Sequence, residues 1–220
     1  MASRPLKKAV TEFAVITVSI LLAFSLDAWW DHRSQRVDLE TALVALQDEF
    51  SSAQAELARA HGIVDGVAVK AAAMRGLMGP DPSPAAVDSL RAMSPGFRVT
   101  TSDPATGVLQ SLLASDLLGA ASSMELRTHL ADWPARVADY QEVEGYLNAN
   151  IRAFSERTDD ATPLPGSPFG FEGEAILSDP WFWNRLGRLI NSTVFVRRDN
   201  AALSERAEAL KGLIAEELGR

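Results

Sequence analysis

Three stretches of this 220-residue chain carry mostly apolar residues at alternating steps of four and three positions. The first seam contains Leu39, Leu43, Leu46, Phe50, Ala53, Leu57, Ala60, Val64, Val67, Ala71, Met74 and Met78. The second contains Leu126, Leu130, Trp133, Val137, Tyr140, Glu144, Leu147, Ile151 and Phe154. The third contains Phe182, Leu186, Leu189, Thr193, Val196, Asn200, Leu203, Ala207, Leu210 and Ile214. Such spacing places each seam on one face of an α-helix and is typical of helices that pack lengthwise. We therefore predict an all-α chain with an elongated antiparallel bundle of about four helices.

Two seam positions are polar. Glu144 lies in the second seam and Asn200 in the third. A polar residue at such a position either sets the register or oligomer state of the packed helices or faces water at the edge of the bundle. The sequence leaves both alternatives open.

An apolar run lies close to the N-terminus. Residues 13–26 carry no charge, and residues 28–30 extend the run to about eighteen apolar positions, which at ~1.5 Å per residue approaches the ~30 Å core of a bilayer. Trp29 and Trp30 end the run, at the position where aromatic residues commonly anchor a helix in the membrane interface. We predict a single membrane-spanning helix over residues 9–30.

A cleaved signal peptide is the competing interpretation of this run. Residues 23–25 form a weak small-x-small cleavage site after an apolar centre. Glu12 interrupts the boundary between the basic and apolar regions, and no helix breaker separates the run from the seam that follows. These features favour an uncleaved anchor.

The basic residues set the expected orientation. Three Lys or Arg residues precede the run, whereas Arg33 and Arg36 follow it beside acidic neighbours. The excess of basic residues predicts a cytoplasmic segment over residues 1–8 and a helical domain over residues 31–220 on the opposite side. In a bacterium this is a single-pass inner-membrane protein with a periplasmic domain. The absence of cysteine is compatible with that location.

Helix breakers and capping residues divide the C-terminal domain. We predict loops near residues 79–84, 93–104 and 158–178. Ser83, Asp103 and Asp179 each precede a proline, which suits the first position of a helix. Ser122 and Glu125 have the spacing of a capping box.

One face of the predicted membrane helix is a candidate contact surface. It contains Glu12, Ile16, Ser19, Ala23 and Asp27. Ser19 and Ala23 form a small-xxx-small pair, which permits close approach of a second helix. Carboxylates within a membrane segment often mark function, although Glu12 and Asp27 lie shallow enough to reach the interface. Trp29 and Trp30 are the expected interfacial anchors.

No pattern in the chain indicates an active site. The metalloprotease, serine hydrolase, P-loop and dinucleotide-binding motifs are absent, and there is no cysteine. Glu125, His129 and Asp132 share a helix face as metal ligands could, but Arg136 continues the row, as in an ordinary salt-bridged surface. The net charge of −8 argues against nucleic acid and against broad adhesion to anionic lipid. We expect no enzyme activity, metal or cofactor.

Three segments carry a family resemblance. The segment TEFAVITVSILLAFSLDAWWDHR, residues 11–33, resembles the N-terminus of a family of small single-pass bacterial membrane proteins of unknown function. The segments DPATGVLQSLLASDLL and LRTHLADW are similar to the middle region of that family. The resemblance implies that Glu12, Asp27, Trp29 and Trp30 are hallmark positions, with two tryptophans here where one is usual. It implies an anchor and a helical domain, and no mechanism.

These features predict a membrane-anchored helical interaction or scaffold module, an accessory subunit of a bacterial envelope complex. Its partners would be the bilayer, through residues 9–30, and a protein or a second copy of the chain. An extracytoplasmic small-molecule sensor that acts through a partner is the first alternative, and an enzyme of unknown type is the second. A buried polar pocket would favour the sensor, and a wide exposed apolar patch would favour the scaffold.

Overall fold

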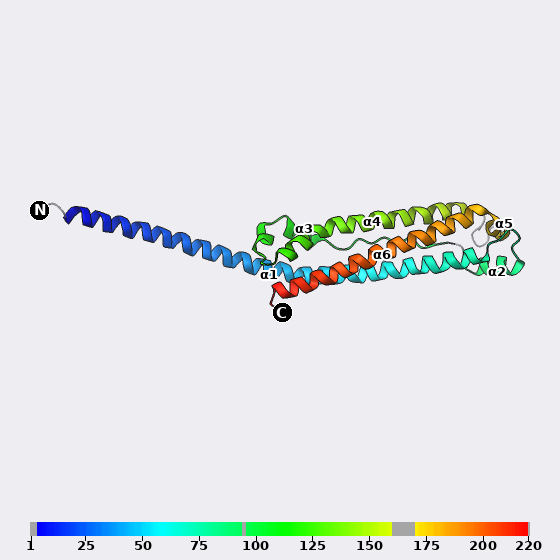
Figure 1. Ribbon diagram of the computed structural model, residues 1–220, viewed down its shortest axis with the longest axis horizontal. Helices are drawn as coiled ribbons and strands as arrows, with labels where there is room; N and C mark the ends of the chain where they lie inside the picture. The colour runs from blue at the N-terminus through cyan, green and yellow to red at the C-terminus, as the bar shows by residue number, and fades with distance from the viewer. Residues whose placement is uncertain (1–3, 94–95, 160–169, 220) are drawn as a thin grey trace.

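A computed structural model describes residues 4–93, 96–159 and 170–219, with the side chains of residues 4–12 and 14 outside the description. Within these residues the chain is built from helices, which confirms the all-α prediction. One helix, α1 (Arg4–Leu77), is 74 residues long. Its N-terminal part projects from the rest of the molecule, and its C-terminal part belongs to a bundle (Figure 1). The apolar run and the first seam therefore lie on one continuous helix.

Two further long helices complete the bundle. α4 (Met124–Asp159) runs parallel to α1 and continues through Pro134, whereas α6 (Pro180–Glu217) runs antiparallel to both (Figure 1). α6 packs along both neighbours, while α1 and α4 approach each other closely at fewer points. The described residues thus contain three long helices where about four were predicted.

The seams form the core of this bundle. Every residue of the three seams is buried except Met78, which is half-buried at the end of α1. Phe50 of α1 meets Trp133 of α4 edge-on, with ring centroids 5.1 Å apart. At the opposite end of the bundle, Phe154 packs edge-on against Phe182 at 5.4 Å. The 3–4 periodicity therefore identified the packed faces correctly.

An extended segment, residues 96–106, takes the place of a fourth long helix. It returns along the bundle from the end of α2 (Pro84–Met93) to the start of α3 (Gly107–Leu113), as Figure 1 shows. The return is needed because α1 and α4 point the same way. An extended chain advances ~3.3 Å per residue against ~1.5 Å in a helix, so it covers the distance with fewer than half the residues.

Tertiary contacts relocate two of the predicted helix starts. Asp103-Pro104 does not begin a helix; α3 begins at Gly107, where the Glu49 carboxylate of α1 accepts hydrogen bonds from the backbone N–H of Val108 and Leu109 at 2.7 and 3.1 Å. The cap of α4 is Ser123 rather than Ser122: its Oγ accepts from Leu126 N at 3.1 Å.

The side chain of Glu217, at the end of α6, explains the shift at α4. Its carboxylate accepts hydrogen bonds from the backbone N–H and Oγ of Ser122 and from the backbone N–H of Ser123. The other two expected caps are present: Ser83 Oγ accepts from Ala86 N at 3.2 Å, and Asp179 accepts from Trp181 N at 2.8 Å.

Short elements close the two ends of the bundle. α3 and the 3₁₀ turn η1 (Asp116–Ala120) cover the end at which the projecting part of α1 enters. α2 and α5 (Gly173–Ser178) pack together at the far end, with α5 inside the stretch 158–178. Phe171 packs there, and a Cβ on Gly173 would lie 2.3 Å from its ring, so this position favours glycine.

The projecting part of α1, residues 4–38, is called the stalk below. All its described side chains, from Phe13 to Asp38, are exposed, and Leu39 is the first buried residue. No helix in the part of the chain that the structure describes contains an apolar stretch long enough to cross a membrane.

Candidate functional site

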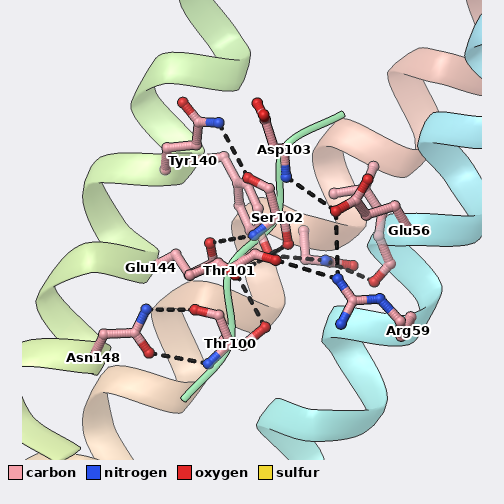
Figure 2. A network of polar contacts seen from close by, with 12 residues as sticks. Glu56, Arg59, Thr100, Thr101, Ser102, Asp103, Tyr140, Glu144 and Asn148 are labelled. Atoms are coloured by element: carbon pink, nitrogen blue, oxygen red, sulfur yellow. Dashed lines mark hydrogen bonds and ion pairs between the residues drawn. The ribbon is translucent and has the colours of Figure 1, made fainter. Parts of the chain in front are cut away.

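The extended segment is held by side chains that bind its backbone (Figure 2). Burial alternates along it: Thr100, Ser102 and Pro104 are buried, and the residues between them are exposed. This is the period of a β-strand, but no second strand is present in the described residues to bond its N–H and C=O groups. Side chains of α1 and α4 therefore provide the missing partners.

Asn148 of α4 acts like a neighbouring strand. Its Oδ1 accepts from the backbone N–H of Thr100 at 3.1 Å, and its Nδ2 donates to the backbone carbonyl of the same residue. Two helix turns before it, Gln141 Nε2 donates to the carbonyl of Ser102 at 3.1 Å. Both amide side chains thus satisfy backbone groups that would otherwise be unpaired inside the bundle.

Glu144 lies at the centre of this cluster and is only 4% exposed. Its carboxylate accepts from the backbone N–H of Ser102 at 2.8 Å, from Ser102 Oγ at 3.0 Å and from Thr100 Oγ1 at 3.2 Å. Tyr140 Oη donates to it at 3.4 Å. No cation pairs with it among the described residues, so these donors alone compensate for its removal from water.

Helix α1 binds the exposed side of the same segment. Arg59 donates to the backbone carbonyl of Thr101 at 3.2 Å, and Glu56 accepts from the backbone N–H of Asp103 at 3.1 Å. The two side chains also form an ion pair with each other at 3.3 Å. Figure 2 shows the segment running between the two helices, with bonds to both sides.

Asn200 connects α6 to this cluster. Its Nδ2 donates to the carbonyl of Leu57 in α1 at 3.0 Å and to Tyr140 Oη in α4 at 3.2 Å. Burial raises the pKa of the Tyr140 phenol, and the nearby Glu144 carboxylate adds to that increase, so the hydroxyl keeps its proton. Glu144 and Asn200 are therefore both buried, and the water-facing alternative is wrong for both. Asn200 links α6 to α1 and α4, whereas Glu144 binds the extended segment.

Chemically this cluster is closed. The polar atoms of Glu144, Asn148 and Asn200 described above are bonded to the chain's own groups. An open cavity of about 210 Å³ between α4 and α6 is lined by Arg136, Asp139, Tyr140 and Asp199. The cluster itself positions a chain segment within the bundle.

Among the described residues, the predicted contact face of the stalk has no partner. Ile16 is 58% exposed, and Ala23 and Asp27 are exposed as well. Ser19 Oγ donates to the carbonyl of Val15 at 2.8 Å. The side chain of Glu12 lies outside the described residues, so its place on this face stays a prediction.

The two expected anchor residues are adjacent and exposed. Trp29 and Trp30 have ring centroids 6.5 Å apart, and the guanidinium of Arg33 lies 5.9 Å from the centre of the Trp29 ring. The pairing joins an amphipathic ring to a cation just beyond the apolar run.

The metal-like row on α4 is not assembled into a site. Asp132 pairs with Arg206 of α6 at 3.8 Å. In the described parts of the chain no group of three His, Asp or Glu side chains is placed to hold a metal ion. The sequence did not point to residues 96–106 as a buried polar strip, because hydroxyl residues in a loop carry no distinguishing pattern.

Comparison with known protein families, with curated proteins and with solved structures finds no match to this chain.

Proposed function

We propose that this protein is a membrane-anchored scaffold, an accessory subunit of a bacterial envelope complex whose helical bundle stands outside the inner membrane. The anchor would be residues 9–30, with residues 1–8 in the cytoplasm and residues 31–220 in the periplasm. The observation that carries the proposal is the contrast between the two parts of α1. Its bundle part buries every apolar seam residue but the last, whereas its stalk leaves large apolar side chains exposed.

The exposed residues surround the stalk on all sides. They are Phe13, Val15, Ile16, Val18, Ile20, Leu21, Leu22, Phe24, Leu26, Trp29 and Trp30. A helix that packs against one partner needs a single apolar stripe, while one that is apolar all round belongs in an apolar surrounding. A lipid bilayer supplies that surrounding without any protein contact.

The polar side chains in this run support the same assignment. Thr17, Ser19 and Ser25 each donate to the carbonyl four residues earlier, at 2.9, 2.8 and 2.7 Å. Hydroxyl donors satisfied by their own helix do not require water. From Ala9 onward the backbone of the run also lies in one continuous helix, where its N–H and C=O groups bond within the helix.

A scaffold role is favoured over catalysis by the closed cluster around Glu144. The bundle is built from three long packed helices, would be anchored at one end and presents an exposed surface. At ~1.5 Å per residue, helices as long as α4 and α6 extend roughly 50 Å from the end at which the stalk enters.

Topology tests the anchor directly. The chain has no cysteine, so Ser3→Cys and Ala201→Cys each introduce one reactive thiol. In cells with a permeabilised outer membrane, an impermeant thiol reagent should label the variant at the exposed position 201 and not the one at position 3. Equal labelling of both, or a mature N-terminus at residue 26 in mass spectrometry, would contradict the proposal.

Assembly tests the scaffold role. After gentle solubilisation at native expression levels, the full chain should run in an assembly larger than its own 23.8 kDa plus detergent. A strictly monomeric chain under these conditions would contradict a subunit role while leaving the anchor unaffected.

A further inference from the structure

The first turns of the stalk beyond the apolar run have two chemically different faces. Trp29, His32, Arg33, Arg36, Val37 and Glu40 line a shallow open cavity of about 390 Å³ on one face. Asp31 precedes Arg33 by two residues, and residues two positions apart on an α-helix point about 200° away from each other around the helix axis. By the same geometry Asp27 and Asp38 lie with Asp31, away from the arginines, whereas Glu40 lies on the arginine face, one turn beyond Arg36 and farther from the apolar run.

The basic face stands at the depth of lipid headgroups if the apolar run spans the bilayer. At ~1.5 Å per residue, Arg33 and Arg36 lie about 5 and 9 Å beyond Trp30 along the helix, and the headgroup layer is roughly 5–8 Å thick on each side. Both side chains are exposed, and long arginine side chains reach back toward the interface. Arg33 has no ion-pair partner among the residues described.

Trp29 completes a site for a phosphate ester. Its ring lies under the Arg33 guanidinium at 5.9 Å and orients that group, while its apolar part suits the glycerol and upper acyl region. Arginine binds phosphate through two parallel N–H donors, and the His32 ring can add a third. The net charge of −8 disfavours broad adhesion to an anionic surface, so any attraction must come from this local face.

We propose that the face formed by Trp29, His32, Arg33 and Arg36 binds the phosphate of an anionic phospholipid at the point where the stalk leaves the membrane. This rests on the proposed membrane anchor. A lipid bound here would fix how deep the stalk sits and which way the bundle faces.

Brominated lipids test the proposal, because bromine quenches only tryptophans that touch the lipid. Trp133 is buried in the bundle, and Trp181 and Trp183 lie at its far end, so quenching reports Trp29 and Trp30. The full chain is reconstituted in phosphatidylcholine vesicles with a small, equal fraction of brominated phosphatidylglycerol or brominated phosphatidylcholine. The anionic lipid should quench more strongly, consistent with a local enrichment of about fivefold.

Three variants sharpen the test. Arg33→Gln with Arg36→Gln should make the two lipids quench equally. Arg33→Lys with Arg36→Lys keeps the charge and should retain most of the preference. Asp27→Asn with Asp31→Asn, on the opposite face, should not reduce it. Equal quenching by both lipids in the unmodified chain would overturn the proposal.

Two further outcomes are distinguishable. If neither lipid quenches, Trp29 and Trp30 do not touch the bilayer, and the anchor proposal fails together with this inference. If soluble glycerol phosphate at constant ionic strength abolishes the preference, the site takes a free phosphate ester, and the lipid assignment is overturned.

Discussion

The side-chain amide of Asn148 pairs with both backbone polar groups of Thr100, as a neighbouring β-strand would. Through these two hydrogen bonds the extended segment lies inside a bundle of helices without leaving the N–H and C=O of Thr100 unpaired. Ser102 is held in the same way, because Glu144 accepts from its backbone N–H and Gln141 donates to its backbone carbonyl. The fold therefore depends on a few helix side chains that bind backbone.

Truncation of Asn148 tests this dependence. Asn148→Ala leaves the buried N–H and C=O of Thr100 without partners, and each buried unsatisfied group costs about 1–3 kcal/mol. We expect a loss of stability of that order in urea denaturation. Glu142→Ala, nearly two turns away on the exposed side of α4, should change stability by less than about 0.5 kcal/mol. A loss no larger than in this control would mean that water replaces the amide easily.

The core packing makes a second prediction. Phe50 and Leu147 are buried seam residues, so Phe50→Ala should lower the free energy of unfolding by about 3–5 kcal/mol and Leu147→Ala by about 2–5 kcal/mol. Asp48→Ala, beside Phe50 on the exposed face of α1, is the matched control. Thermal melts followed by far-UV circular dichroism measure the three variants. An unchanged melting temperature for Phe50→Ala would disprove the assigned packing.

Glu217 makes a pH-dependent contribution. Burial opposes ionisation of its carboxylate, but hydrogen bonds from Ser122 and Ser123 and the charge of Arg36 outweigh burial and lower its pKa. A group with a lowered folded-state pKa stabilises fully above its unfolded pKa and loses this contribution as the pH falls through the folded value.

The comparison is between the unmodified chain and Glu217→Gln. The variant should be less stable at pH 7, and the difference should shrink as the pH falls below about 4.3, the ordinary pKa of Glu. Melting temperatures across pH 3–7 measure this. A difference that is constant over the whole range would show that the carboxylate charge contributes nothing.

The stalk face makes a prediction about association. If Ser19 and Ala23 allow close approach of a second membrane helix, Ser19→Leu or Ala23→Leu should reduce crosslinking of the full chain in native membranes. Val18→Leu changes a side chain on another face and should not. Glu12→Gln separates a requirement for charge from one for a hydrogen bond. Equal crosslinking in all four variants would place the contact surface outside the membrane segment.

Sequence periodicity was sufficient for the helices and their packed faces. A helix that must bury one side repeats its apolar residues every three or four positions, and this requirement is local and visible in any window of the chain. Leu57, Tyr140 and Leu203 could therefore be assigned to the core before any contact was known. The caps at Ser83 and Asp179 were equally accessible, because a capping side chain acts within three residues.

Only the tertiary structure decided which partners meet across the chain. The α3 helix begins where Glu49 caps it from sixty residues away, and α4 begins at Met124 with Ser123 as its cap because Glu217 binds Ser122. Hydrogen bonds of this kind depend on the direction of two groups in space and have no period in the sequence. For the same reason the sequence predicted that Glu144 and Asn200 mattered to register or faced water, but not which. Their burial among Tyr140, Ser102 and the Leu57 carbonyl requires α1, α4, α6 and the extended segment to be in place at once.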